Sequence, residues 1–453
     1  MTQLERRATF SLASIYALRM LGLFMILPVL SLFAEQIEGS TPLLIGLAIS
    51  IYGLSQALLQ IPFGLLSDRF GRKKIIIIGL ILFSSGSLIA ATSTTIYGVL
   101  LGRALQGSGA IAAAIMALVA DLTQEVHRTK AMATIGASIG ISFGIAITLG
   151  PVLAGYIGVQ GIFYLTAILA IIAIFVVIFI VPNPQQSIVH RDAELVPAQI
   201  SQVLKNPDLL RLNYGIFILH LILTASFVVL PLLIRDAGLA AENHWQIYLP
   251  VLVTSMAVII PFIILAEKKR QMKKVFIGAI ITLVIANISL SQLHNDLIAL
   301  TSFLWLFFCG FNLLEATLPS LISKTAPADL KGTAMGAYSS SQFMGAFLGG
   351  VLGGWLYGDY GAQAVFLCSA IAAASWVLIA LFMRTPRYLA NLLISLETIK
   401  ENKADTFSEQ LLAIDGIAEV RLHFEEKTAY LKVDNQLLDK QQLQELLSDW
   451  SKA

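Results

Sequence analysis

Four ionisable residues stand inside long apolar runs of the sequence, where a charge is unusual. They are Arg19, Arg103, His220 and Glu315. An ionised side chain in hydrocarbon is costly, so such groups normally face a partner or a cavity and mark the path of an ion or a substrate. Glu315, in "FNLLEATLPS", must therefore pair with a cation or carry a proton for part of the time. These residues predict reversible proton binding, with Glu315 as the best candidate.

The other three residues each have a structural interpretation as well. Arg103 could pin helices together by donating to backbone carbonyls, and Arg19 could be a fixed counter-charge. His220 is a lone histidine on an apolar helix, where a packing role is more common than a titrating one. The sequence leaves these alternatives open.

Uncharged polar residues in the same apolar runs are candidates for lining a cavity. Asn312 lies one turn before Glu315 and could hydrogen-bond to it. Interhelical hydrogen bonding is the competing role, and we expect it for at least half of the set. The candidates are Tyr52, Gln56, Gln60, Gln106, Asn312 and Gln342.

A second constellation is charged and lies between two apolar runs. In "GLLSDRFGRKK", residues 64–74, five charges occupy the seven positions from Asp68 to Lys74. Basic loops mark the cytoplasmic side of a membrane protein, which is reason enough for Lys73 and Lys74. That rule does not explain the acid at Asp68, or the glycines at Gly64 and Gly71.

Composition identifies the elements that must position these residues. The chain has 453 residues, of which 57% are hydrophobic and 13% charged, whereas a soluble domain is about a quarter charged. Its apolar runs are about 20 residues long, which is the length that a helix needs to cross a bilayer. We predict an all-α membrane protein with twelve spans, near residues 10–34, 42–66, 74–95, 96–121, 131–157, 161–182, 211–235, 244–266, 274–292, 297–322, 332–357 and 362–383.

The charges of the short loops predict the orientation of these spans. One set of loops is basic and ends with Arg384 and Arg387, whereas the alternate set holds Arg235 beside several acids. The basic set belongs in the cytoplasm, together with both termini. The first span is too long for the apolar core of a cleavable signal. Cys309 and Cys368 lie in apolar runs and form neither a disulfide framework nor a metal-binding pattern.

The chain repeats itself, and this divides it into domains. Residues 128–170 align without a gap with residues 331–373, a shift of 203 positions that pairs Gly158 with Gly361. We therefore expect two pseudo-symmetric six-helix bundles, at 1–182 and 211–385, joined by a polar cytoplasmic linker at 183–210 with a short helix at 198–205. Two such halves around a midplane site are a design for alternating access.

The tail, residues 388–453, has a different pattern. "LANLLISLE" is a possible strand and "FSEQLLAIDG" a short amphipathic helix. "IAEVRLHFEEKTAYLKVD" alternates as two strands that turn near residues 425–427, and "DKQQLQELLSDW" is a second helix. The order β-α-β-β-α predicts a small cytoplasmic α+β domain of the ferredoxin-like kind. It resembles heavy-metal-associated domains, but it has no cysteine, so we expect no metal site.

The charged motif also carries a family resemblance. Gly64, Asp68, Arg69, Gly71, Arg72 and Lys73 match the loop 2–3 signature of the major facilitator superfamily, G-x-x-x-D-R-x-G-R-K/R, and "LLGRALQGSGA" resembles its fourth-span motif. The resemblance covers about residues 8–385 and indicates the drug/proton antiporter branch, although Ala154 stands where the fifth-span motif usually has a glycine. It implies a multi-pass transporter of the bacterial inner membrane, and no enzyme.

This resemblance suggests a role for the motif as a cytoplasmic gate. It implies that the carboxylate of Asp68 meets the N-terminus of span 11, near Gly332, where a helix dipole stabilises an anion. Asp121, at the cytoplasmic end of span 4, is a candidate partner for Arg72. Contacts of this kind would hold the cytoplasmic side closed.

Together these features predict a proton-coupled secondary transporter, most readily an exporter of the multidrug-efflux type. Arg19 and Arg103 lie in the opposite half from Glu315, so an ion pair between them would form or break as the halves move. No nucleotide-binding motif is present, so the proton gradient is the expected energy source, with no cofactor. The expected partners are the bilayer and a small-molecule substrate, without nucleic acid; a monomer would suffice. An uptake symporter and a non-transporting membrane sensor remain as alternatives.

Overall fold

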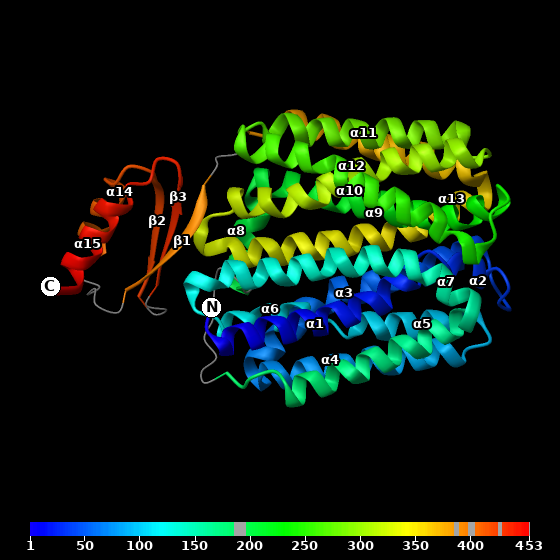
Figure 1. Cartoon of the computed structure of the whole chain (residues 1–453), viewed down its shortest axis with the longest axis horizontal. Coiled ribbons are helices and arrows are strands. Elements are labelled where there is room, and N and C mark those ends of the chain that lie inside the picture. The colour runs from blue at the N-terminus through cyan, green and yellow to red at the C-terminus, as the bar shows by residue number, and fades with distance from the viewer. Residues whose placement is uncertain (185–195, 385–388, 397–403, 425–427, 453) are drawn as a thin grey trace.

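A bundle of long helices makes up most of the molecule, and a small α+β domain lies at one end of it (Figure 1). The computed structural model describes residues 1–184, 196–384, 389–396, 404–424 and 428–452. Arg387, part of the linker and the predicted tail turn lie outside these ranges. Both termini lie at the same end of the bundle (Figure 1).

The predicted spans are present as helices, although their number needs an explanation. The N-terminal part contains α1 (Gln3–Met25), α2 (Leu30–Ala34), α3 (Pro42–Phe70), α4 (Arg72–Thr92), α5 (Ile96–Ser108), α6 (Ala112–Asp121) and α7 (Glu125–Phe179). The C-terminal part contains η1 (Pro197–Gln199), α8 (Ile200–Lys205), α9 (Pro207–Asp236), η2 (Ala241–Asn243), α10 (Trp245–Lys268), α11 (Met272–Leu293), α12 (Leu297–Thr325), η3 (Ala328–Leu330) and α13 (Lys331–Leu381). Within the described residues, 10 helical stretches are long and apolar enough to cross a membrane.

Two of these helices are long enough to cross twice. At about 1.5 Å per residue, the 55 residues of α7 and the 51 of α13 each far exceed the thickness of a bilayer. Each is interrupted by one non-helical glycine, Gly158 with φ 68° and Gly361 with φ 78°. Residues that carry a side chain rarely adopt a backbone conformation with positive φ, so glycine is required at both breaks. The two glycines are the pair that the internal repeat aligns.

Two predicted spans are instead each divided into two helices. Span 1 becomes α1 and α2, because the chain turns around Pro28, which cannot donate a helix hydrogen bond. Span 4 becomes α5 and α6, which separate at Gly109. A Cβ atom at Gly109 would lie 2.2 Å from the carbonyl oxygen of Gly79, so this break allows spans 3 and 4 to approach closely.

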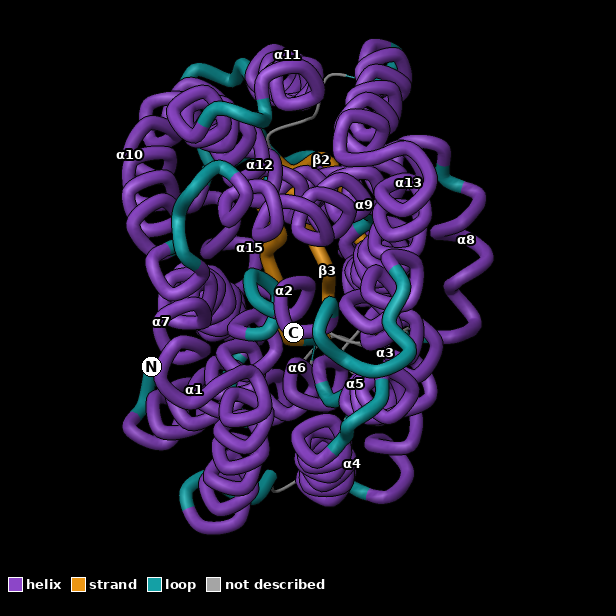
Figure 2. Tube along the Cα trace, turned by 90° about the vertical axis from the view of Figure 1, so that its right-hand side faces the viewer, coloured by secondary structure: helices purple, strands orange, loops and turns teal. Residues whose placement is uncertain are grey.

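The two halves of the bundle meet along a stripe of small residues. Figure 2, viewed along the bundle, shows α1 and α3–α6 on one side and α9–α13 on the other. Helix α3 packs along α13, where a Cβ atom at Gly46 would lie 2.1 Å from the carbonyl oxygen of Gly350. A Cβ atom at Gly53 would lie 2.7 Å from the carbonyl oxygen of Phe343. Larger side chains would hold the two backbones apart.

The tail forms a three-stranded antiparallel sheet with two helices, in the predicted element order. The elements are β1 (Ala390–Ser395), α14 (Ala404–Leu412), β2 (Ile417–His423), β3 (Thr428–Val433) and α15 (Lys440–Lys452), and the strand order is β1-β3-β2. The rings of Phe407 on α14 and Trp450 on α15 lie 5.1 Å apart beside the sheet. A ferredoxin-like domain has a fourth strand, and the described residues of the tail contain three.

The tail domain packs against the end of the membrane bundle. Every residue of β3 is buried, so both faces of the sheet are covered at this strand. The Lys432 ammonium donates to the carbonyl oxygens of Ser323 and Lys324, at 2.7 and 3.1 Å, in the last turn of α12. Two ion pairs flank this contact: Arg270 with Asp434 at 2.9 Å, and His423 with Asp329 at 3.6 Å. All three contacts join the tail to the C-terminal half.

Candidate functional site

The predicted acid, Glu315, lies beside the predicted histidine. Glu315 is on α12 and His220 on α9, and their Oε2 and Nε2 atoms are 4.0 Å apart. The Glu315 side chain is 39% exposed although it lies in the middle of an apolar helix, and that of His220 is 13% exposed. Its neighbours His220 and Tyr338 are on α9 and α13, and α13 packs along α3 of the other half, so Glu315 lies near the contact between the halves. Glu315 Oε2 has no hydrogen-bond partner among the described residues.

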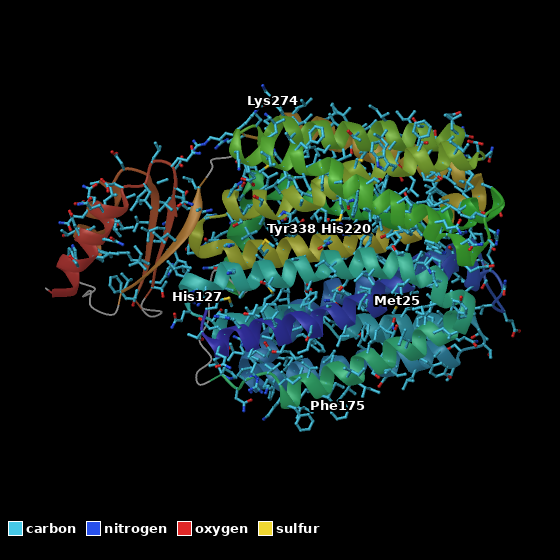
Figure 3. The ribbon with its side chains drawn as sticks, viewed as in Figure 1. Met25, His127, Phe175, His220, Lys274 and Tyr338 are labelled. Carbon is cyan, nitrogen blue, oxygen red and sulfur yellow. The ribbon has the colours of Figure 1, made fainter. Side chains whose placement is uncertain are left out.

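Gln342 and Tyr338, both on α13, complete this cluster. The amide nitrogen of Gln342 lies 2.8 Å from His220 Nε2, so the amide donates and the ring accepts in this arrangement. A neutral ring with its proton on Nδ1 satisfies that geometry. Tyr338 is near enough to Glu315 for an electrostatic interaction, and its hydroxyl has no hydrogen-bond partner within the described part of the chain. Figure 3 labels His220 and Tyr338 in the central part of the bundle.

Aromatic rings separate this cluster from the N-terminal half. Phe311, one turn before Glu315, has its ring 6.0 Å from the His220 ring and stacks on Phe143 of α7 at 6.4 Å. Phe24 of α1 packs edge-on against Phe143 at 5.0 Å. The cluster around Glu315 therefore adjoins an aromatic contact between α12 of one half and α7 of the other.

Arg19 lies on α1 of the N-terminal half. Its side chain is fully buried, and Nη2 donates to the hydroxyl of Tyr52 and to Oε1 of Gln56, both at 2.7 Å. Tyr52 and Gln56 come from α3. The Tyr52 ring lies 6.4 Å from that of Phe343 on α13, so this polar group also reaches the boundary between the halves.

Arg103 has a different environment. Its Nε and Nη2 donate to the carbonyl oxygens of Ala48 and Ile49 at 3.2 and 3.1 Å, and its Nη1 donates to Gln106 at 2.8 Å. These contacts join α5 to α3 within one half. Arg103 thus takes the pinning arrangement that the sequence left open.

The predicted contacts of Glu315 with Arg19, Arg103 and Asn312 are not found among the described contacts in this conformation. The described contacts of Arg19 and Arg103 are with neutral groups of their own half. Asn312 donates to Ser255 on α10 at 3.0 Å rather than to Glu315. Its position one turn away directs its amide to a neighbouring helix.

The remaining polar candidates form interhelical hydrogen bonds. Gln60 donates to the carbonyl oxygen of Gly336 at 3.2 Å and to the hydroxyl of Ser340 at 2.7 Å, linking the two halves. Gln106 donates to Ser87 at 2.7 Å within the N-terminal half. Of the six candidates, Gln342 is the one with a described hydrogen bond to His220, the neighbour of Glu315.

Sequence reasoning missed Tyr338 and the aromatic pair Phe143 and Phe311. Tyr338 lies one turn before Gln342 on the same helix, which was an available signal. Phenylalanines are common throughout apolar spans, so the pairing of these two required knowledge of which helices meet.

The charged motif forms a compact cluster at one end of the N-terminal half. Arg72 pairs with Asp68 within the motif and with Asp121 at the end of α6, where Nε and Oδ2 are 3.3 Å apart. Asp121 and Arg72 are almost fully buried. Gly71 has a φ of 100°, which explains this glycine. Lys73 donates to the carbonyl oxygen of Val181 and to Asn183, at 2.7 and 2.9 Å.

The expected contact between Asp68 and the start of span 11 is not found. Asp68 pairs with Arg72, and a described hydrogen-bonded link from α3 to α13 is that of Gln60. The carboxylate is instead held by its own loop, four residues away. Gly64 packs on α6, where its Cβ would lie 3.3 Å from that of Ala113, and the guanidinium of Arg69 lies over the Phe70 ring.

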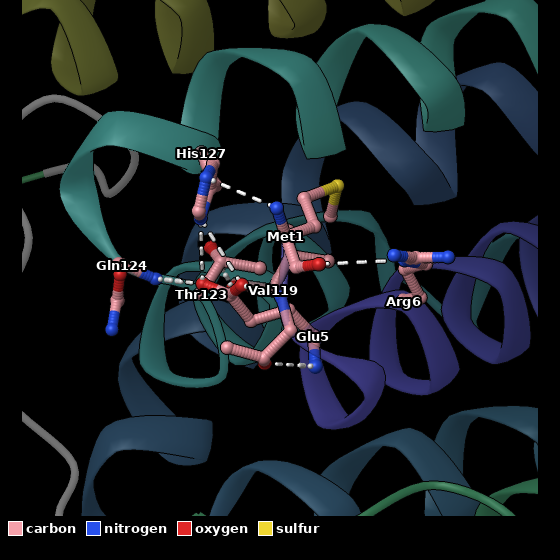
Figure 4. A network of polar contacts seen from close by, with 8 residues as sticks. Met1, Glu5, Arg6, Val119, Thr123, Gln124 and His127 are labelled. Carbon is pink, nitrogen blue, oxygen red and sulfur yellow. Dashed lines mark hydrogen bonds and ion pairs between the residues drawn. The ribbon is translucent and has the colours of Figure 1, made fainter.

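A second polar network ties the N-terminus to the same end of this half (Figure 4). Glu5 is buried and accepts hydrogen bonds from the backbone of Thr2 and of Gln124, at 2.6 and 2.9 Å. His127 bridges the carboxylate of Glu5 and the terminal amine of Met1, each at 3.1 Å. The start of α1 is thereby joined to the start of α7.

At the far end of the bundle, an ion pair crosses between the halves. Arg235, at the end of α9, lies 2.6 Å from Glu35, at the end of α2. Glu35 also lines a cavity of about 370 Å³ with Tyr357 and Pro42. The far end therefore has an ion pair between the halves. The sequence indicated charged residues in these loops but not that they pair.

The family assignment follows from comparison with known proteins. The family model described as Major Facilitator Superfamily matches residues 12–350, which is most of the chain. The chain belongs to the Major Facilitator Superfamily. It is a multi-pass membrane transporter and not an enzyme, as the charged motif had indicated.

Relatives within the superfamily differ in their similarity to this chain. The inner membrane transport protein YajR of Escherichia coli (strain K12) is 48% identical over 448 residues, covering 99% of this chain and 98% of that protein. Multidrug resistance protein 2 of Bacillus subtilis (strain 168) is 28% identical, covering 74% and 85%. The fold matches the crystal structure of a bacterial homologue of the human lysosomal transporter Spinster, inward-facing and occupied, with a TM-score of 0.70 at 12% identity, covering 85% of this chain and 98% of that one.

Proposed function

We propose that this member of the Major Facilitator Superfamily is a proton-coupled secondary transporter that exports a small molecule by alternating access. One observation carries the proposal: Glu315 is partly exposed within an apolar helix, next to His220 and without a hydrogen-bonded partner for Oε2 among the described residues. An acid in that position can exchange a proton with whichever side of the membrane is open.

His220 and Gln342 give the acid a second proton-binding group. While the Gln342 amide donates to His220 Nε2, that nitrogen cannot hold a proton. If the amide rotates to present its oxygen, Nε2 can carry the proton and hydrogen-bond in turn. Glu315 lies 4.0 Å from the same nitrogen, so a proton on either group alters the charge that the other feels. We propose that the pair binds and releases the coupled proton.

Alternating access requires contacts between the halves that can separate. The pair Glu35–Arg235 at one end is a candidate for the far-side gate. The cluster of Asp68, Arg72 and Asp121 at the other end is the candidate for the cytoplasmic gate. Its contacts lie within one half in this conformation, so closure of this end would have to bring the cluster to α13.

We further infer that α7 and α13 each cross the bilayer twice, which gives twelve crossings in two halves. The inner-membrane location of the similar YajR protein supports the same location for this chain. The basic loops place both termini in the cytoplasm. On this proposal the tail is a cytoplasmic domain of the ferredoxin-like class, shortened by one strand.

Transport measurements in proteoliposomes test both coupling and direction. The purified protein is reconstituted in vesicles, and the uptake of ethidium and of 2-naphthoate is followed with the lumen acidic, with the lumen alkaline and without a pH gradient. A proton-coupled exporter is an antiporter, so its substrate accumulates in the lumen when the lumen is acidic, because the substrate enters as protons leave. Accumulation with the proton flow indicates a symporter, and uptake that ignores the gradient refutes coupling.

A further inference from the structure

Arg19 is a buried cation whose hydrogen bonds are incomplete. The side chain is fully buried, yet Nε and Nη1 have no hydrogen-bond partner among the described residues. The partners of Nη2, Tyr52 and Gln56, are both neutral. A buried charge without an opposite charge or a full set of acceptors is strongly disfavoured, so something outside the chain is needed to complete this site.

Within the described part of the N-terminal half, no acid forms an ion pair with Arg19. Glu35 lies beyond the turn around Pro28, at the end of α2, and it pairs with Arg235. Asp68 and Asp121 pair with Arg72 at the opposite end. In the other half, the described partner of Glu315 is His220, at 4.0 Å.

Arg103 shows what a structural arginine looks like in the same half. Each of its three side-chain nitrogens donates a hydrogen bond to an oxygen of the chain. Its guanidinium lies 5.4 Å from the Tyr52 ring, close to the 5.9 Å of Arg19. Tyr52 therefore lies beside two buried arginines. The described residues provide hydrogen-bond acceptors for all three side-chain nitrogens of Arg103, but they leave Nε and Nη1 of Arg19 without one.

The surroundings of Arg19 indicate what could complete it. Its guanidinium lies between the rings of Tyr52 and Phe83, at 5.9 and 5.6 Å. The Tyr52 ring reaches Phe343 of the other half, so opening this boundary exposes the site to the pathway. A group that binds here needs a negative charge, to accept from the free N–H groups, and an apolar body that matches the aromatic walls.

We propose that Arg19, with Tyr52 and Gln56, is the subsite that binds the carboxylate of the transported substrate, and that this substrate is an apolar organic anion. This rests on the proposed transport function and adds the substrate class. The anion site belongs to one half and the proton site at Glu315 to the other, so their occupants meet at the boundary that opens and closes.

Binding of a matched series of compounds tests this directly. The full chain in lipid nanodiscs is titrated with 2-naphthoate, 2-naphthamide and 2-naphthylmethylamine, which share one ring system and differ in charge. We expect the carboxylate to bind at least about tenfold more tightly than the amide, since one charge-assisted interaction is worth about that much. Equal affinity for the carboxylate and the amide, tighter binding of the amine, or no binding of the carboxylate overturns the proposal.

Variants then locate the binding. Arg19→Gln should abolish the preference for the carboxylate over the amide, whereas Arg19→Lys should retain part of it. Arg103→Lys is the matched control and should keep the preference. A preference that survives Arg19→Gln moves the anion site elsewhere.

The same assay separates this inference from the proposed coupling. Glu315→Gln should keep the preference for the carboxylate over the amide, because the acid is not part of the anion subsite. If Glu315→Gln binds normally and still uses a pH gradient, the proposed coupling site is wrong and the anion subsite stands. If coupling through Glu315 is found with a substrate that is not an anion, the proposed coupling site stands and the anion subsite is wrong.

Discussion

Individual residues of one type occupy very different positions in this chain. Arg19, Arg72 and Arg103 are all buried, but one pairs with acids, one donates to backbone carbonyls, and one has free N–H groups. The sequence marked all three as unusual. It could not separate them, because the distinction depends on which oxygens the neighbouring helices bring within reach.

The buried pair of the charged motif makes a prediction about stability. Asp121→Asn removes the more deeply buried of the two acids that pair with Arg72, and breaking a buried ion pair costs up to about 3–5 kcal/mol. We expect a clearly lower thermal midpoint, measured by scanning fluorimetry in detergent. Asp68→Asn is the control, because the Asp68 side chain is 34% exposed and exposed pairs contribute at most about 1 kcal/mol. Equal losses for the two variants would contradict this ranking.

Secondary-structure elements were largely predictable, and their exceptions have local causes. The element order of the tail followed from its change of period, and the linker helix at Ile200–Lys205 was expected. The breaks of span 1 at Pro28 and of span 4 at Gly109 were not predicted, because continuous hydrophobicity outweighed one proline and one glycine. The assembly of α7 and α13 from two spans each needed the backbone angles of Gly158 and Gly361.

These two glycines lead to a prediction for the helices that they divide. Gly158 has φ 68° and ψ 171°, a conformation that is essentially restricted to glycine, so Gly158→Ala should cost about 1–3 kcal/mol. Gly361→Ala should behave in the same way. Thermal midpoints of the purified variants measure the loss.

Gly136 provides the control within the same helix. A Cβ atom at Gly136 meets nothing within 4 Å, and its backbone is helical. Gly136→Ala should therefore be neutral, or stabilising by up to about 1 kcal/mol. A loss at Gly136 that matches the loss at Gly158 would refute the explanation by backbone conformation.

At the scale of the whole molecule, the tail domain is joined to the C-terminal half by charged groups that respond to pH. Burial lowers the pKa of Lys432 to about 8 in the docked state, from its ordinary value of 10.5. The docked state thus holds fewer protons at Lys432 than the free domain between about pH 8 and 10.5. Docking should therefore strengthen as the pH rises through this window.

Distances between spin labels measure this effect. Labels at Gln444 on α15 and at Lys274 on α11 should give one narrow distance at pH 9.5 and a broader distribution at pH 7. Lys432→Met removes the titrating group and should make the distribution independent of pH in this window. A distribution that broadens with rising pH would contradict the expected sign.

Asp329 sets the acidic limit of the same contact. Burial raises the pKa of Asp329, but its hydrogen bond with His423 and nearby positive charge outweigh burial, and the net shift is downward. A lowered pKa stabilises the docked state at neutral pH, and this contribution is lost as the pH falls through the lowered value. Asp329→Asn should remove that acidic loss in the same distance measurement.

Removal of the tail tests whether the bundle is independent of it. Deletion of residues 388–453 removes the contacts of Lys432, Asp434 and His423, which lie at one end of the C-terminal half. We expect membrane insertion and basal transport to remain, because the bundle buries its own core. A truncated chain that inserts but does not transport would instead assign an essential role to the tail.

The most direct test of the account concerns Glu315. Glu315→Gln keeps the shape of the side chain but cannot bind or release a proton. In proteoliposomes we predict that this variant still exchanges substrate across the membrane without a gradient, but no longer accumulates it when a pH gradient is imposed. Glu267→Gln, at an exposed acid that pairs with Lys324, is the control and should accumulate normally. Undiminished gradient-driven accumulation by Glu315→Gln would contradict the central claim and move the coupling site elsewhere.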